Sequence, residues 1–186
     1  MNTQNFRTLA MQVALAVAAY GTLAPTTTLA HDGEPHGGFN LEQALSQARK
    51  ATAHLNSVHA AIAAGYTKFP DLHGDCVAQP GQGGMGVHYV NASLLDEKVD
   101  PLRPEFLVYG KTASGRHQLV ALEYVVFAPL WDAMNPQPPV LFGHPFHLVR
   151  TPNRYGTADA FYELHVWAWE HNPNGLFNDW NPNVSC

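Results

Sequence analysis

Three polar residues stand among apolar ones in segments that have the two-residue period of β-strands. They are His88 in residues 85–91, Glu123 in 117–127 and His165 in 161–171. Burying a carboxylate or an imidazole without a partner is costly, so each should meet a cation, a metal ion or strong hydrogen-bond donors. Two imidazoles and one carboxylate on a rigid sheet are a frequent ligand set for Zn²⁺ or Fe²⁺. We therefore predict a metal site formed by His88, Glu123 and His165.

The last of these segments also predicts a ligand-binding face. Because side chains alternate along a strand, every second residue of 161–171 should point to the same side. That side carries Glu163, His165, Trp167 and Trp169. Two indole rings with a few polar groups suit a small organic or peptide ligand. The alternative function is therefore a non-catalytic binding module that uses Glu163, Trp167 and Trp169. Glu163 or Glu105 could instead act as a base beside the metal. The chain has no nucleophile elbow, and the sequence leaves open whether the protein is an enzyme.

The same residues also allow an arrangement without a metal. Glu123 could pair with Arg116, Arg150 or Arg154, and a strand histidine among apolar residues is often a hydrogen-bonded part of the core. A structural envelope protein that has only such buried polar contacts is a third hypothesis.

A second candidate metal site lies near the predicted start of the mature chain. Cleavage before His31 would leave a free α-amine next to an imidazole, and His36 follows five residues later. Nitrogen ligands of this kind suit the tetragonal geometry of Cu²⁺. The alternative is a leader whose histidines bind nothing. The predicted cofactors are therefore Zn, Fe or Cu.

The candidate metal ligands can meet only if the strands that carry them are neighbours. The predicted fold is α+β. The predicted strands are 85–91, 105–110, 117–127 and 161–171, with a short edge strand near 140–142. The second and third should form a hairpin. One long helix over 41–64, with Asn40 as its N-cap, should pack an apolar stripe from Leu41 to Ile62 on an antiparallel sheet of four to six strands. Long proline-rich loops should connect the other parts.

The first thirty residues have the features of a secretory signal peptide. The only charged residue, Arg7, precedes an apolar stretch, and Thr28 and Ala30 occupy the small-residue positions that a signal peptidase requires. The stretch is shorter than the roughly 20 apolar residues of a spanning helix. We expect a signal peptide over 1–30, a flexible leader over 31–39 and one globular domain over 40–186. The protein should be periplasmic or secreted, with no membrane span after cleavage.

The composition of the mature chain limits its partners. Without Arg7, nine basic residues (10 minus 1) face fifteen acidic ones, which gives a formal charge of −6. This balance argues against nucleic acid and anionic membranes as partners. Eleven histidines supply groups that titrate or bind metals near neutral pH. A small molecule or a metal ion is the expected partner, and nothing in the sequence indicates an oligomeric state.

The two cysteines predict a disulfide. Cys76 and Cys186 are an isolated pair, and such pairs are most often bonded in an oxidising compartment. The bond would close a long loop and hold the C-terminal segment to the body of the domain. A thiolate pair that binds copper or zinc is the alternative, but the CxxC spacing typical of such sites is absent.

Three segments carry a resemblance to a known group of proteins. The segments GGMGVHYVN (83–91), LEYVVF (122–127) and LHVWAWEHNPNGLFNDWNPNVSC (164–186) resemble a group of exported bacterial proteins of unassigned function. The resemblance covers most of the chain after Gly65. It implies an exported soluble domain and implies no reaction or ligand.

Overall fold

The computed structural model of the chain describes residues 38–69, 76–111, 115 and 117–186. The predicted signal peptide, His31 and His36, and most of the predicted leader lie outside these residues. None of the helices in the described ranges is long and apolar enough to cross a membrane. The described residues form an α+β fold, as predicted.

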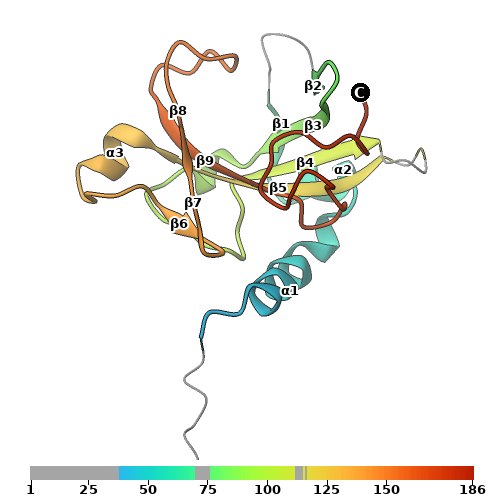
Figure 1. Cartoon of the computed structure of the whole chain (residues 1–186), viewed down its shortest axis with the longest axis horizontal. Helices are drawn as coiled ribbons and strands as arrows, with labels where there is room; N and C mark the ends of the chain where they lie inside the picture. The colour runs from blue at the N-terminus through green and yellow to red at the C-terminus, as the bar shows by residue number, and fades with distance from the viewer. Residues whose placement is uncertain (1–37, 70–75, 112–114, 116) are drawn as a thin grey trace, which may run out of the picture. The chain divides into compact units, whose positions relative to one another are not determined.

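An antiparallel sheet of seven strands organises the fold (Figure 1). Its order is β1 (Thr67–Lys68), β3 (Gly83–Val90), β4 (Phe106–Lys111), β5 (His117–Phe127), β9 (Phe161–Val166) and β8 (His147–Val149), while β2 (Val77–Gln79) also pairs with β3. A separate pair joins β6 (Val140–Leu141) to β7 (His144–Pro145). The four predicted central strands and the hairpin are present, but the last strand ends at Val166 and not at His171. The sheet is larger than the predicted four to six strands, because two- and three-residue strands leave no periodic pattern in a sequence.

The predicted long helix over 41–64 is wrong. The structure has α1 (Leu41–Thr52), a 3₁₀ turn η1 (Ala53–Leu55) and a separate α2 (Val58–Ala63). The predicted N-cap is confirmed, since the Gln43 amide donates to the Asn40 side chain at 2.9 Å. Elsewhere in the described ranges there are two short helical segments, η2 (Ala92–Leu94) and α3 (Ala128–Asp132).

The predicted helix is interrupted because residues of the sheet donate hydrogen bonds to its carbonyl groups. The Tyr109 hydroxyl donates to the Leu55 carbonyl, and the Leu119 amide donates to the Asn56 carbonyl. Ser57 then starts α2 as a new N-cap by accepting from the Ala60 amide. The break changes the helical phase, so Ile62 is 57 % exposed rather than part of the buried stripe.

The sheet has two differently packed faces, which we call the helix face and the site face. On the helix face, residues of α1 and η1 such as Leu45 and Leu55 pack against the sheet. The sheet residues of this face include Leu107, Tyr109, Leu122, Tyr124, Leu164 and Val166. The site face carries two smaller apolar clusters, with Val108, Ala121 and Trp167 in one and Val90, Phe106, Val125 and Phe161 in the other. The polar residues of interest lie between these two clusters.

A β-bulge in β5 corrects one part of the predicted alternation. Simple alternation places Leu119 on the same face as Glu123. The register instead pairs Val108 with Ala121 and Tyr109 with Leu119, which leaves Val120 as an extra residue. The extra residue turns Leu119 onto the helix face, where it packs in the core. Glu123 lies beyond the bulge and keeps the predicted face.

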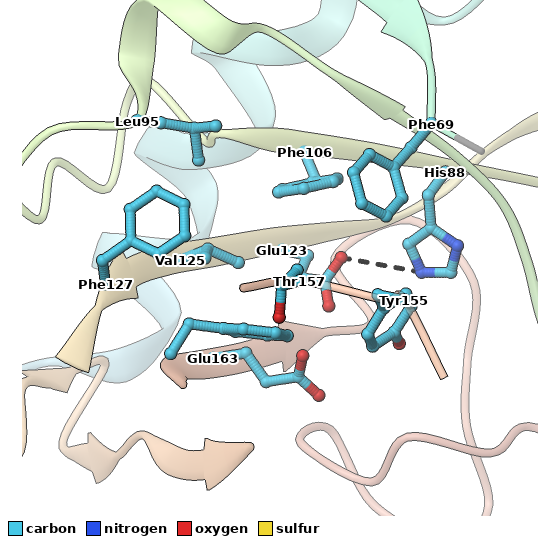
Figure 2. A pocket seen from close by; sticks show the side chains of 11 residues that line it. Phe69, His88, Leu95, Phe106, Glu123, Val125, Phe127, Tyr155, Thr157 and Glu163 are labelled. Carbon is cyan, nitrogen blue, oxygen red and sulfur yellow. Dashed lines mark ion pairs between the residues drawn. The ribbon is translucent and has the colours of Figure 1, made fainter. Parts of the chain in front are cut away.

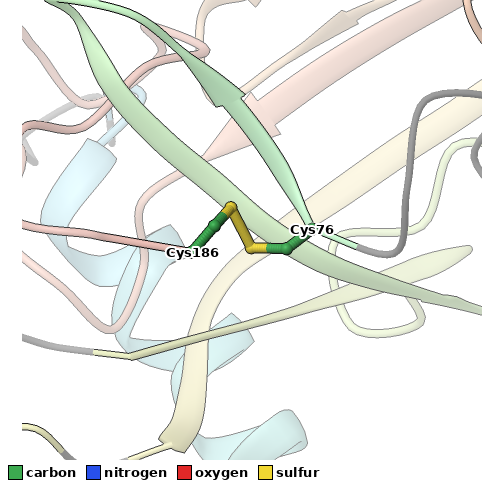
Figure 3. Close-up of a disulfide and its surroundings, with 2 residues drawn as sticks. All are labelled: Cys76 and Cys186. Atoms are coloured by element: carbon green, nitrogen blue, oxygen red, sulfur yellow. A yellow bond between two sulfur atoms is a disulfide. The ribbon is translucent and has the colours of Figure 1, made fainter.

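A disulfide between Cys76 and Cys186 holds the C-terminal segment beside β3 (Figure 3). The Cα atoms are 5.6 Å apart and the bond closes a separation of 110 residues, so the predicted pairing is confirmed. Further contacts fix the same segment. Gly84 forms an isolated β-bridge with Asn181, and the Val184 side chain is buried on the site face.

The approach of β3 to this segment requires glycine at position 83. Gly83 has φ +109°, and a Cβ atom there would lie 2.1 Å from the Asn181 carbonyl oxygen. We expect Gly83→Ala to lower the free energy of unfolding by about 2–4 kcal/mol, through backbone strain together with overlap. Urea denaturation would measure this. Gly81→Ala is the control, because Gly81 has φ +79° with nothing within 4 Å and should show only the strain, about 1–2 kcal/mol. Equal losses in both variants would contradict the packing argument.

Candidate metal site

Neighbouring strands bring His88, Glu123 and His165 together on the site face. Glu123 of β5 lies directly opposite His165 of β9 in the antiparallel register. His88 comes from β3, with β4 in between, and its side chain reaches across until Nε2 lies 3.6 Å from a Glu123 carboxylate oxygen. Each residue offers one potential ligand atom, and these three atoms all lie within 4.8 Å of one another. We call these three residues the inner group. Bonds of about 2 Å to a shared ion would draw the atoms slightly closer.

The imidazole of His165 is buried without a hydrogen-bond partner in the described part of the chain. Its exposed fraction is 1 %, and neither Nδ1 nor Nε2 has a partner. Its neighbours are rings: the ring centres of His88 and Trp167 lie 6.4 and 4.7 Å away. Because nearly all buried polar side chains in native proteins are satisfied, this imidazole is the group that most requires a ligand.

Burial disfavours the charged forms of the inner group. It raises the pKa of Glu123 well above its usual value, and nearby carboxylates raise it further. Burial also lowers the pKa of His165 well below its usual value, and neighbouring histidines act in the same direction. His165 is therefore neutral near pH 7, which is the form of imidazole that binds metal ions.

An apolar pocket opens beside His88, Glu123 and Glu163 (Figure 2). It encloses about 50 Å³, and its other walls are formed by Phe69, Leu95, Phe106, Val125, Phe127, Tyr155, Thr157 and Phe161. Figure 2 shows the Glu123 carboxylate directed toward His88, with the carboxylate of Glu163 nearby. A single water needs roughly 10–15 Å³, so the pocket has room for water or a ligand of a few atoms.

A second polar group adjoins the first. His147 of β8 lies opposite Glu163 of β9, and its Nε2 is 2.8 Å from a Glu163 carboxylate oxygen. Asp179, from the segment after β9, completes a set whose ligand atoms also lie within 4.8 Å of one another. We call His147, Glu163 and Asp179 the outer group. The hydrogen bond to Glu163 raises the pKa of His147, and burial raises the pKa of Asp179.

Sequence reasoning does not find the outer group. β8 has three residues, too few to show a period, and Asp179 lies in an irregular segment. The one available signal is the spacing of His144 and His147, which could share a metal in a loop. The structure separates this pair, since His144 stacks on Phe177 with ring centres 4.4 Å apart while His147 contacts Glu163.

Comparison with models of protein families, with curated proteins and with solved structures finds no match for the chain. The site must therefore be interpreted from its own geometry.

The structure keeps Trp167 on the sheet face that the sequence predicts, but it places Trp169 on the opposite face. β9 ends at Val166, because the amides of Trp169 and Glu170 donate to the carbonyl of the bulge residue Val120. The Trp167 ring is 3 % exposed and packs on the site face, where its Nε1 donates to the Asn178 carbonyl. Trp169 packs on the core of the helix face and donates to Thr52. Of the predicted ligand-binding residues, Glu163 alone lines the pocket beside the inner group.

Glu105 lies outside both groups and has a structural contact of its own. One of its carboxylate oxygens accepts from the Val125 amide at 3.1 Å. Burial raises the pKa of Glu105 to about 8. The side chain is therefore a buried acid that keeps its proton near neutral pH.

This shift predicts a pH-dependent stability. The folded chain holds the Glu105 proton up to about pH 8, while the unfolded chain releases it near 4.5. The free energy of unfolding should therefore fall as the pH rises between these two values. Glu105 should contribute a slope of roughly 1.4 kcal/mol per pH unit, and this contribution should level off above pH 8. Glu105→Gln can still accept from Val125 but cannot ionise, so its stability should fall less steeply. Urea denaturation of both proteins from pH 5 to 9 measures the difference, and parallel curves would contradict the prediction.

Proposed function

We propose that this protein is an exported metal-binding protein that holds a divalent transition metal through His88, Glu123 and His165. The observation that carries the proposal is the buried imidazole of His165, which lacks a hydrogen-bond partner among the described residues. One of its nitrogen atoms lies within 4.8 Å of potential ligand atoms of a second histidine and a carboxylate. A metal-free polar network would leave both ring nitrogens of His165 unsatisfied, whereas a metal ion would accept a lone pair from one of them.

The ligand types support zinc or iron(II), with copper as a further candidate. Two imidazole nitrogens and one carboxylate oxygen form a borderline-soft set that each of these ions accepts. Three protein ligands also leave a coordination position for water or a small molecule, and the pocket beside Glu123 provides the space. A metal in such a site supplies Lewis acidity or activates a bound water. The side chains of this chain would hold the ion and surround its open position with apolar walls.

An exported location is supported by three features. They are the signal-like first thirty residues, the resemblance to exported bacterial proteins and the Cys76–Cys186 disulfide, which persists in oxidising compartments. The aromatic binding module is the second candidate, because Trp167 and Trp169 both line another pocket of about 650 Å³. It is the weaker one, because Trp167 is 3 % exposed and packs against His165.

Metal content and thermal stability together test the metal proposal. The protein purified from the periplasm is analysed for transition metals, stripped with chelator and titrated with Zn²⁺. Bound metal should raise the melting temperature, because a ligand at 100 times its dissociation constant stabilises the folded state by about 2.7 kcal/mol. His88→Gln and His165→Gln should each lose this response.

His54→Ala is the matched control, because His54 is an exposed histidine of η1 on the opposite side of the sheet. It should bind metal like the wild type. No bound metal and no uptake by the wild type would end the proposal, as would full uptake by both glutamine variants.

A further inference from the structure

The outer group has the composition of a metal site in its own right, with a buried glutamate between a half-buried aspartate and an exposed histidine. It offers one imidazole and two carboxylates whose ligand atoms lie within 4.8 Å of one another. The three residues come from β8, from β9 and from the segment that the disulfide holds. A site that draws on three separate parts of the chain can form only in the folded protein.

Glu163 is more than a member of an acidic cluster. Its side chain is 5 % exposed, and Oε1 contacts His147 Nε2 at 2.8 Å. Its other oxygen, Oε2, is buried and has no hydrogen-bond partner in the ranges that the structure describes. A buried carboxylate oxygen without a donor is costly, whereas a bound cation would satisfy it. This atom is an independent sign of a missing positive ligand.

The two groups meet at their glutamates. Glu123 and Glu163 lie on adjacent strands, β5 and β9, where Glu163 pairs with Val125, two residues along from Glu123. Both line the same pocket (Figure 2). Sites that bind two metal ions hold them about 3.5–4 Å apart with carboxylates between them. Adjacent glutamates from neighbouring strands are suited to that position.

The charges of the two groups are compatible with two ions. Glu123, Glu163 and Asp179 bring three negative charges when ionised, and the histidines bring none when they bind a metal. Two divalent ions and one bound hydroxide would balance these charges, whereas a single divalent ion would require one carboxyl group to keep its proton.

From this geometry we propose that the inner and outer groups together form a two-metal centre. His88, Glu123 and His165 hold the inner ion, and His147, Glu163 and Asp179 hold the outer ion. The proposal rests on the metal-binding function proposed above and extends it to a second site. The outer ion is the more accessible one, since His147 is 49 % exposed while the inner residues are buried.

Metal stoichiometry tests the second site. The stripped full-length protein is titrated with Zn²⁺ and, separately, with Co²⁺, whose visible absorption reports each ligand environment. We expect two equivalents in the wild type. His147→Ala and Asp179→Asn should each bind one equivalent, while His88→Gln should lose the other one. His144→Ala is the control, because this exposed histidine lies three residues from His147 and should leave both equivalents in place.

The possible outcomes separate the two proposals. One equivalent in the wild type, lost in His88→Gln but kept in His147→Ala and Asp179→Asn, overturns the outer site and leaves the inner site standing. One equivalent lost only in the outer variants overturns the inner site. No uptake overturns both. Circular dichroism of each variant shows that a loss of metal is not a loss of fold, and His147→Ala should pass this check because His147 is half-exposed.

Discussion

Replacing Glu123 with glutamine will weaken metal binding severely while making the metal-free protein more stable. Glutamine has nearly the same shape, but it carries no charge and is a poor metal ligand. In the metal-free state the substitution removes a buried carboxyl group that lies against a second one, Glu163, and we expect a gain of about 1–3 kcal/mol. With metal present, the loss of a direct ligand should cost more than the 10- to 100-fold in affinity that is typical of residues that only support ligands.

Chemical denaturation at pH 7.5 with and without Zn²⁺ measures both effects on one protein. The matched control is Glu97→Gln, since Glu97 is an exposed glutamate outside both groups and should change neither quantity. A Glu123→Gln protein that is less stable without metal, or that binds Zn²⁺ like the wild type, would show that Glu123 has a structural partner instead of a metal.

Removing the disulfide will cause the largest loss of stability. The Cys76–Cys186 bond closes a separation of 110 residues, and the chain-entropy model assigns about 4–5 kcal/mol to a loop of that length. We therefore expect the double variant Cys76→Ala, Cys186→Ala to unfold at much lower urea concentration. Urea denaturation in the absence of metal isolates this effect.

The wild type with reductant is the internal comparison, since it should lose the same stability as the double variant. The double variant itself should not respond to reductant. A loss below about 1 kcal/mol would contradict this model, and would mean that the reduced segment detaches locally in the folded protein or that the unfolded chain stays compact.

The inner group could be predicted because each of its residues lies in a strand with a clear two-residue period. Glu123 and His165 interrupt apolar faces, so the cost of burying them points to a shared partner. The sequence cannot show that they face each other directly, because that depends on pairing two strands separated by more than thirty residues. The bulge at Val120 is equally hidden, and Glu123 keeps its predicted face only because it follows the bulge.

The incorrect predictions share one physical cause. Residues that are distant in the sequence form hydrogen bonds with the backbone where the predicted elements end. The helix ends early because Tyr109 and Leu119 bond to its carbonyls, and β9 ends early because Val120 accepts from the residues after it. Local propensity contains no information about such bonds. The outer group was missed for a related reason, since the alignment of His147 with Glu163 is made by a three-residue strand.

For a protein that is exported and binds two ions, as proposed above, the position of the disulfide would give maturation a defined order. Cys186 follows Asp179 in the sequence and is bonded to Cys76 beside β3, whereas the inner group comes from strands of the central sheet. A freshly exported, reduced chain could therefore load its inner ion as soon as the sheet forms. The outer ion would bind only after thiol oxidation has bonded the segment that carries Asp179 to the rest of the domain. Binding of the second ion would then depend on the redox state of the compartment.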